Sequence, residues 1–581
     1  MDVGLVKEGI RWLIRQSIRY SKPYRRIVII SSILIAASSI PSIPMAYATR
    51  DFVDSLIAYL RGEAISEFYL LNLVGIIVIA TLLRQVLHIL GEGLHLKYQF
   101  VARKDYTLAI IRKTMNMPLK SARSITVGDY SQTLLNDIDA FGGLALGFMP
   151  GVIVDNIVPL LTQVYIMGTL SPHLLLISLS LTLLNMLLYR RYLPLIRDYE
   201  GKIREESSRS MNAALEALIN LIVIKARGVM DCFLRRVEQH RRSITDLVVK
   251  RYFTNRKAGL IMALLGNFQP YLILIIGSYL AMYGFITFGT VIAFWLPVWR
   301  FYSGSMNFYY GTYMSMASWI PPVKRVVKFL EEEEERRGSK EISSFESLEL
   351  RNVTFRYDHE DVLKNVYFSI RKGEKVAIVG RTGSGKSTLA LIISGFLRAT
   401  SGDVIINGIN AEEYNLPNPK LAYVPQEAPI FSDMTLKDNI ILGRNVDEKE
   451  LLSAIEICEL EELMDKLDAA VGRGGAGLSD GQKQRINLAR AVLDKPYVII
   501  LDEALAAVDS KTESRIFRNL YRNLPETTFI VISHRLSTIM YSDRIAVIEG
   551  GRIVGQGTHE ELMKTNKTYK ELVEKQVITE K

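Results

Sequence analysis

Cysteine is scarce in this sequence, and a cleavable secretion signal is missing. The two cysteines, Cys232 and Cys458, lie far apart and in unrelated contexts. Within one chain, this excludes a disulfide framework and a metal site built from cysteines. The first long apolar run begins late, and no small-residue cleavage site stands out beside it. We therefore expect that no signal peptide is removed.

Long apolar runs fill the first half of the chain. Hydrophobic residues make up 49% of the sequence, and its mean hydropathy is +0.15. Six runs are each close to the ~20 residues that a membrane helix needs: residues 27–48, 68–90, 144–170, 174–189, 260–282 and 290–308. The fourth run is short, and Pro297 and Arg300 interrupt the sixth. We predict an all-α membrane domain of six helices over residues 27–328, with both ends on one side of the membrane.

Basic residues are distributed unevenly around these runs. Those behind the formal net charge of +10 gather in residues 7–26, 97–123 and 190–204, and the intervening connections are short or near neutral. Cytoplasmic connections carry the excess of Lys and Arg in membrane proteins. We therefore expect a multi-pass protein, in the plasma membrane, with these three segments in the cytoplasm. A nucleic-acid-binding arm would not follow the spans in this way, so we expect no nucleic-acid partner.

Three segments lie outside the predicted spans. Apolar residues among the basic ones near the N-terminus predict an amphipathic segment, residues 1–26, against membrane lipid. The connections after the second and fourth runs are long and helix-forming, with turn signals in their middles. They indicate helices that extend into the cytoplasm, turn and return, and whose turns could dock on another domain. Residues 329–345 are charged and are interpreted as a linker, a solvated helix end plus loop.

The chemistry is concentrated in residues 346–581, where short apolar strands alternate with helical patterns. The stretch "VAIVGRTGSGKSTLALIISGF" reads as a strand, a glycine-rich loop and a helix. Gly380, Gly385, Lys386 and Ser387 match the P-loop pattern in the context that this motif requires. The glycines allow backbone amides to surround phosphate oxygens, and the helix N-terminus adds partial positive charge. Lys386 is expected on the β- and γ-phosphates, and Ser387 on Mg²⁺.

Three further predicted strands end in polar residues. The apolar run "YVIILD" ends at Asp502 and Glu503, and two others deliver Gln426 and His534. Ligands of open α/β sheets bind beyond the carboxyl ends of the strands. We therefore expect these four side chains to meet the P-loop at one site, with Asp502 supporting Mg²⁺ and Glu503 polarising an attacking water.

At this point the chain resembles the ATP-binding cassette (ABC) transporters. The resemblance is to an exporter-type half-transporter, in which six membrane helices are fused to one α/β P-loop ATPase domain. It rests on the order of the motifs: Walker A at residues 380–388, the Q-loop at Gln426, the signature at residues 478–482, Walker B at residues 498–502 with Glu503, the D-loop at Asp509 and the switch histidine His534. Regions near 118–130 and 216–228 resemble the two coupling helices.

The resemblance implies a function and a set of site residues. It implies ATP-driven export by alternating access, with ATP between Walker A of one chain and the signature of a second. Glu503, His534 and Gln426 would be catalytic, and Mg²⁺ would be held by Ser387, Gln426 and Asp502. The nucleotide would be bound by Tyr357, Gly380, Arg381, Thr382, Gly383, Ser384, Gly385, Lys386, Ser387, Thr388, Ser479, Gly481 and Gln482. Tyr357 would stack on adenine, although it could also be only a strand residue.

Three positions depart from the family pattern. Asp480 replaces the usual glycine of the signature, "LAAVD" replaces the common "SALD", and Ala470 stands where many exporters have glutamate. In "GLSDGQKQRINLARAVL", Ser479 and Gln482 are spaced as a capping box, and Asp480 in the first turn suits the helix dipole. The carboxylate of Asp480 must then point away from the phosphate, or the site is weakened, since two like charges at so short a distance repel.

The membrane half offers candidate substrate residues. Charged residues inside spans indicate function, so we expect Arg84 and Asp155 either to pair or to face a shared wet cavity; Arg84 could also reach the inner headgroups. Tyr302, Met306, Tyr309 and Tyr313 share one helical face. This face could line a cavity for an amphipathic substrate or could simply pack against another helix.

Two readings of the function remain open at this stage. The substrate of an exporter would be a small amphipathic compound, a lipid or a peptide-like molecule; without a peptidase-like extension, a peptide-processing exporter is not indicated. The alternative is an ATP-gated channel or sensor on the same scaffold, which the intact Glu503 disfavours. The partner chain could be a second copy or a different half-transporter.

Overall fold

The computed structural model describes residues 3–147, 151, 154–309, 313–357, 360–472 and 475–579. Its contacts divide the chain into two compact units. The membrane unit comprises Met1–Met115 and Thr126–Glu332, and the nucleotide unit comprises Asn116–Ile125 and Glu333–Lys581. The predicted transmembrane domain, residues 27–328, thus contains a short segment that clusters with the nucleotide unit instead.

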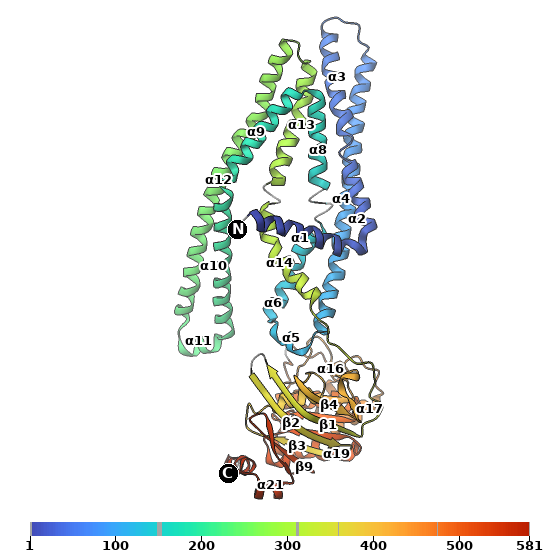
Figure 1. Ribbon diagram of the computed structural model, residues 1–581, viewed down its shortest axis with the longest axis vertical. Helices are drawn as coiled ribbons and strands as arrows, with labels where there is room; N and C mark the ends of the chain where they lie inside the picture. Colours follow the sequence, from blue (N-terminus) through green and yellow to red (C-terminus); the bar gives the residue numbers. More distant parts are fainter. Residues whose placement is uncertain are drawn as a thin grey trace. The chain divides into compact units, whose positions relative to one another are not determined.

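The membrane unit is helical. Its main helices are α1 (Val3–Ser21), α2 (Arg25–Ala37), α3 (Ser42–Leu60), α4 (Glu67–Met115), α8 (Asp155–Leu170), α9 (Pro172–Arg190), α10 (Leu193–Ile219), α11 (Leu221–Arg227), α12 (Met230–Met282), α13 (Phe288–Asn307) and α14 (Tyr313–Glu331). Between α4 and α8 lie α6 (Val127–Gln132), α7 (Ile138–Ala140) and the π-helices Thr133–Asp137 and Phe141–Leu146. Figure 1 shows α10 and α12 side by side, joined at their tip by α11.

Four helical stretches of the described residues are long and apolar enough to cross a membrane: Arg11–Leu60, Glu67–Met115, Pro172–Arg190 and Met230–Met282. The other two predicted spans correspond to α8, which has 16 residues, and α13, which contains Pro297. At 1.5 Å per residue, the 49 residues of α4 and the 53 of α12 extend far beyond a hydrocarbon core of about 30 Å. The predicted fold of six membrane helices with long helical extensions is confirmed.

The first predicted span, residues 27–48, is wrong in detail. A turn over residues 38–41 separates α2 from α3, and α3 then continues to Leu60 through residues that we expected to be a connection. Pro41 explains the break, because proline has no backbone N–H and its ring clashes with the preceding helical turn.

In the N-terminal helix α1, the apolar side of residues 11–21 is covered by protein. Leu13 is fully buried in a cluster that includes Tyr98 of α4 and Val323 of α14. Arg19 pairs with Glu331 at the other end of the unit's sequence. The predicted amphipathic helix is therefore present, but its apolar face packs on the membrane unit, where we expected lipid.

The nucleotide unit contains two sheets. The first has the order β2 (Glu360–Arg371), β1 (Ser347–Tyr357), β4 (Ser401–Ile406), β5 (Ile409–Asn410) and is antiparallel. The second has the order β10 (Arg552–Gly557), β9 (Arg544–Glu549), β3 (Lys375–Val379), β8 (Thr528–Ile532), β7 (Val498–Asp502), β6 (Leu421–Val424). In it, β9, β3, β8, β7 and β6 are parallel, and such strands, buried on both faces, read as continuous apolar runs.

Helices pack around these sheets. They are α5 (Leu119–Ser124), α15 (Lys386–Ile393), α16 (Leu436–Ile441), α17 (Glu448–Ile457), α18 (Asp480–Leu493), α19 (Ser510–Asn523), α20 (Leu536–Ile539), α21 (His559–Thr565) and α22 (Lys567–Thr579). Leu119 of α5 packs against the core of the nucleotide unit, and the Glu335 amide donates to the Asn116 carbonyl at 2.7 Å. The first predicted coupling region therefore begins within the nucleotide unit.

The linker prediction, a solvated loop over residues 329–345, is also wrong in part. After α14 ends at Glu331, the chain lies along residues 413–415, where the Gly338 amide donates to the Tyr414 carbonyl at 3.0 Å. Ile342 and Phe345 are buried in the core of the nucleotide unit. The charged side chains of this segment predict a solvated loop. The contacts with the nucleotide unit are instead made by the backbone and by two apolar residues.

Candidate nucleotide-binding site

The P-loop lies between β3 and α15, as predicted. Gly383 and Gly385 have φ values of +79° and +103°, a region that L side chains rarely adopt. The Lys386 ammonium is buried and donates to the carbonyls of Gly380 at 2.9 Å and Arg381 at 3.1 Å. Its burial lowers the pKa of Lys386. The loop therefore presents its backbone around a desolvated cation, an arrangement suited to phosphate.

Asp502 lies at the end of β7, next to the P-loop helix. The Ser387 hydroxyl donates to Asp502 Oδ1 at 3.1 Å, and the Tyr423 hydroxyl donates to Oδ2 at 2.9 Å. Burial raises the pKa of Asp502, and these two hydrogen bonds oppose that shift. Burial also raises the pKa of Tyr423, so its hydroxyl stays protonated and able to donate.

A magnesium ion fits the oxygen atoms gathered here. Ser387 and Asp502 offer a hydroxyl and a carboxylate oxygen side by side, which are ligands that Mg²⁺ prefers together with substrate phosphates. Within the described ranges, no group of three His, Cys, Asp or Glu side chains could hold a metal. The ion would therefore depend on the nucleotide for its remaining ligands.

Glu503 and His534 contact each other at the same edge of the sheet. His534 Nε2 lies 2.9 Å from Glu503 Oε1, and the Glu503 amide donates to the Ile532 carbonyl of β8 at 3.0 Å. Glu503 has a φ of +51°. Such a backbone costs a non-glycine residue about 1–3 kcal/mol and is concentrated at functional sites. The fold thus holds Glu503 with a strained backbone and its carboxylate beside His534.

Gln426 and Tyr357 are placed less directly. The side chain of Gln426 is exposed, while its carbonyl accepts a hydrogen bond from Gln484 at 3.3 Å. Tyr357 ends β1, and its half-buried ring meets the edge of Phe355 with centroids 4.7 Å apart. Their predicted roles on Mg²⁺ and adenine stay predictions.

The signature stretch forms the predicted capping box. The Ser479 hydroxyl accepts from the Gln482 amide at 3.2 Å, and Gln482 Oε1 accepts from the Ser479 amide at 2.9 Å. The Asp480 side chain is 83% exposed and pairs with Lys483 at 3.1 Å. The carboxylate therefore points to solvent, and the first turn of α18 keeps its amides together.

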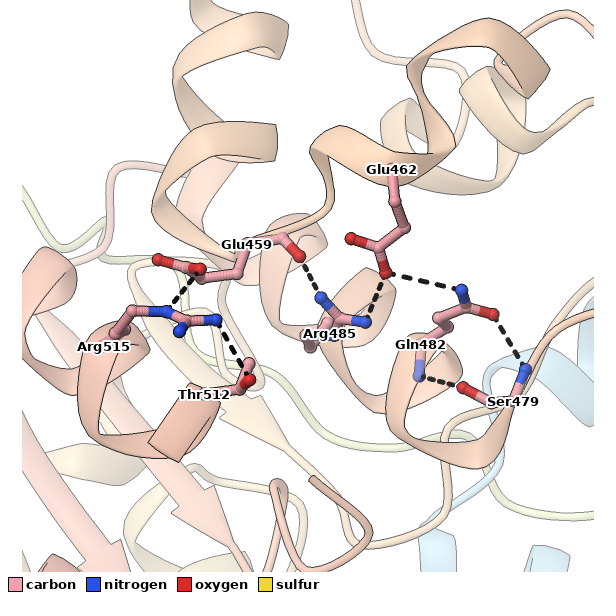
Figure 2. A network of polar contacts seen from close by, with 7 residues as sticks. All are labelled: Glu459, Glu462, Ser479, Gln482, Arg485, Thr512 and Arg515. Atoms are coloured by element: carbon pink, nitrogen blue, oxygen red, sulfur yellow. Dashed lines mark hydrogen bonds and ion pairs between the residues drawn. The ribbon is translucent and has the colours of Figure 1, made fainter. Parts of the chain in front are cut away.

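A polar network supports this helix end from outside (Figure 2). Arg485 donates to the Glu459 carbonyl and, at 2.6 Å, to Glu462 Oε1, which also accepts from Gln482 at 3.4 Å. Burial by itself raises the pKa of Glu462, but the hydrogen bonds and charge of Arg485 reverse this and leave that pKa below its usual range.

The same network reaches α19. Glu459 accepts from Arg515 Nε at 2.8 Å, and Arg515 also donates to Thr512. Asp509 of the D-loop caps this helix by accepting from the Thr512 amide at 3.0 Å. The signature and the D-loop are thus connected on the outer face of the unit.

Comparison with known proteins identifies the family. The model of the ABC transporter family matches residues 363–506, and that of the ABC transporter transmembrane region matches residues 28–296. A protein of Rickettsia bellii named as an export ATP-binding/permease protein is 28% identical over 578 residues, covering 94% of this chain and 96% of that one. The chain belongs to the ABC transporters.

Further relatives agree. A Bacillus subtilis protein named as the multidrug export ATP-binding/permease protein YgaD is 26% identical, covering 96% of this chain and 98% of its own. The solved structure of a bacterial Atm1-family ABC exporter with ATP bound has a TM-score of 0.79 at 22% identity, covering 95% of this chain and 98% of that one. At that identity it shows the shared fold.

Membership fixes the coarse function. This ABC transporter is a multi-pass membrane protein that binds and hydrolyses ATP to drive export. Its structure joins the P-loop, Asp502, Glu503 and His534 at one edge of a sheet. In the described part of the chain, no hydrogen bond joins the P-loop to the signature.

The transporter's membrane candidates are placed differently from our expectations. Asp155 Oδ1 faces His88 Nδ1 at 3.9 Å, and Arg84 lies near Arg300, whose like charge repels it. Among the described residues, Arg84 and Asp155 form no ion pair. The direct pair is therefore wrong, because His88, one helical turn after Arg84, takes its place. A shared wet cavity stays a prediction.

Tyr302 and Met306 are buried packing residues in this structure. The Tyr302 hydroxyl donates to the Met262 carbonyl and accepts from Asn185, both at 2.7 Å. Asn185 and Met262 contact Tyr302 across the helix interface, which favours the packing alternative for Tyr302, and Met306 is buried as well. Tyr309 is half-buried beside Tyr189 and Ala258, and the side chain of Tyr313 lies outside the described residues.

Sequence reasoning missed two side chains of the ATPase site, Tyr423 and Gln484. Tyr423 sits in the strand that delivers Gln426, and Gln484 follows the signature by two residues. Both were within stretches already under study, but their partners come from strands and loops distant in sequence.

Proposed function

We propose that this ABC transporter works as a dimer that exports amphipathic substrates by alternating access. The observation that carries the proposal is a connected ATPase site, Ser387–Asp502 and Glu503–His534, in the same chain as a helical membrane unit. Relatives named as multidrug exporters support a small amphipathic, lipid or peptide-like substrate. The basic segments support a protein of the plasma membrane whose nucleotide unit lies in the cytoplasm.

In the proposed cycle, each residue of the site has one task. Lys386 and the P-loop amides bind the phosphates, and Glu503 takes the proton of the attacking water. Ser387, Asp502 and Gln426 would hold Mg²⁺, which would neutralise phosphate charge. His534 orients Glu503 and contacts the γ-phosphate. Ser479, Gly481 and Gln482 present the N-terminus of α18 to the nucleotide of the partner.

Exposed apolar residues at the tip of the α10–α12 hairpin are evidence for a partner chain. Ile219 and Ile222, in the second predicted coupling region, are 81% and 84% exposed. Isolated exposed apolar residues are ordinary, but these lie among others at one tip, including Leu218 and Val223. Contiguous apolar surface of this kind marks an interaction site, and we assign it to the nucleotide unit of a second half-transporter.

The test is transport by reconstituted protein. We expect vesicles with outward-facing nucleotide units to accumulate a fluorescent amphipathic dye against its gradient, only with ATP and Mg²⁺. Glu503→Gln, which preserves shape and removes the base, should bind ATP without transport. Passive conductance that follows ATP binding in both proteins would instead identify a channel.

A further inference from the structure

Gln484 is a buried side chain of the signature helix that contacts two catalytic loops. It lies in the first turns of α18 and is 7% exposed. Its amide oxygen accepts from the Ala507 amide, in the D-loop, at 2.8 Å, and its amide nitrogen donates to the carbonyl of Gln426, in the Q-loop, at 3.3 Å. A glutamine amide is suited to this position, because one end accepts and the other donates.

The signature helix also touches the D-loop directly. A Cβ added to Gly481 would lie 3.0 Å from the Ala507 carbonyl oxygen, so the helix backbone and the loop are in close contact at this residue. Ala507 is therefore held at its N–H by Gln484 and faces α18 with its carbonyl. A movement of the N-terminus of α18 therefore also moves Ala507.

The D-loop is anchored on its other side by Arg535, the residue after His534. Arg535 donates to the carbonyls of Ala506 at 2.7 Å and Val508 at 2.6 Å, and it pairs with the buried Glu513. The loop that starts at Glu503 is thus fixed between the signature helix and the switch-histidine segment. Gln484 links Gln426 of the Q-loop to this assembly, and Arg490 of the same helix donates to the carbonyl of Pro429 three residues further on.

We propose that Gln484 is a positioning residue that couples the signature to the chain's own Q-loop and D-loop. This rests on the proposed function, in which the signature binds the nucleotide held by the partner. When that nucleotide draws the N-terminus of α18 toward it, Gln484 moves the backbone of Gln426 and Ala507 with the helix. Engagement of one ATP then brings the catalytic loops around the other into place.

The test uses Gln484→Glu and Gln484→Leu in the full-length reconstituted protein. Glutamate keeps the acceptor for Ala507 but places an oxygen against the Gln426 carbonyl, and leucine removes both bonds at similar volume. We expect each to lower kcat for ATP hydrolysis at least about tenfold, with KM for ATP within about threefold, because neither touches the P-loop. Gln556→Glu makes the same chemical change at an exposed site where Gln556 accepts from Arg544, and should leave kcat unchanged.

The outcomes separate positioning from mere packing. A kcat of Gln484→Glu above half the wild-type value would overturn the inference. So would a parallel loss of kcat, ATP affinity and thermal midpoint, which would show that Gln484 only fills the core. The mass of the wild-type particle, measured in the same preparation, tests the proposed dimer separately: a monomer that hydrolyses ATP would contradict the proposed function whatever Gln484→Glu does.

Discussion

At the scale of single residues, Asp480 departs from the family pattern, and its geometry leads us to predict that the signature still works. Its carboxylate is exposed and paired with Lys483, so the helix N-terminus keeps its capping box. Water around an exposed charge screens it strongly, and the nearby ammonium offsets it further. Asp480 thus points outward from the first turn of α18, and the backbone amides lie on the inner side of that turn.

We expect Asp480→Gly to leave ATPase activity within a few-fold of wild type. The change removes a favourable dipole interaction of about 0.3–1 kcal/mol, and glycine is about 0.3 kcal/mol less favourable in a helix than aspartate. Thermal unfolding should therefore occur at a slightly lower temperature. A gain of tenfold or more in kcat would show that Asp480 obstructs the phosphate.

Loss of the Tyr423 hydroxyl should raise the magnesium requirement of the ATPase. Its hydroxyl donates to Asp502 Oδ2, and a hydrogen bond to a charged group is worth about 1.5–3 kcal/mol. Tyr423→Phe should leave Asp502 less well oriented, and the Mg²⁺ concentration for half-maximal ATPase should rise about tenfold. Tyr497→Phe is the matched control, because its hydroxyl donates to the Ser343 carbonyl. Equal responses of the two variants would contradict a role for Tyr423 at the ion.

Some residues of the candidate site could be predicted from the sequence, and others could not. Lys386, Asp502 and His534 could be predicted because each follows a strand or loop with a recognisable pattern. Tyr423 and Gln484 could not, because their significance depends on which atoms β7 and the D-loop bring opposite them. Tyr302 shows the reverse case: its helical spacing was compatible with a cavity or with packing, and only the positions of Asn185 and Met262 distinguish the two.

At the scale of elements, hydropathy located the helices better than it located their ends. The run 27–48 spans a turn because Ser38 to Pro41 are weakly polar, and α3 continues through charged residues because the helix outlasts its apolar stretch. The linker shows a related effect. Its glutamates suggest solvent, but backbone hydrogen bonds to residues 413–415 hold it on the nucleotide unit.

Gly338 allows a test of the docked linker. A Cβ at this position would lie 2.1 Å from the Glu413 carbonyl carbon, so Gly338→Ala must lift the linker from its partner. We expect faster proteolysis within residues 333–345 and fewer transport events per ATP hydrolysed. Gly201→Ala, in α10 with open space around it, is the control and should change neither. An unchanged ratio of transport to hydrolysis in Gly338→Ala would show that docking does not contribute to coupling.

At the scale of the whole molecule, the chain carries one P-loop and one signature. If the two act on the same nucleotide, they belong either to one chain or to two different chains. Within the described residues, the side-chain hydrogen bonds of Lys386 stay inside its own loop, and the side-chain hydrogen bond of Ser479 stays inside its own capping box. The proposed head-to-tail dimer assigns each ATP to a P-loop of one chain and a signature of the other.

Mixing two inactive chains tests this assignment. One carries Lys386→Met and the other Ser479→Arg, and each should be inactive alone because both sites of its dimer are damaged. In a mixed dimer, one site contains both substitutions and the other contains neither. Random pairing makes about half of the dimers mixed, so about a quarter of all sites should be intact. Each intact site should work more slowly than in wild type, because the chain that holds its nucleotide has a damaged signature and loses the coupling proposed for Gln484. Purification of co-expressed, differently tagged chains through both tags leaves mixed dimers only, so about half of the sites are intact and this sample should regain part of the ATPase activity. If P-loop and signature acted within one chain, every site in the mixture would remain damaged, and the mixture would be as inactive as its parts.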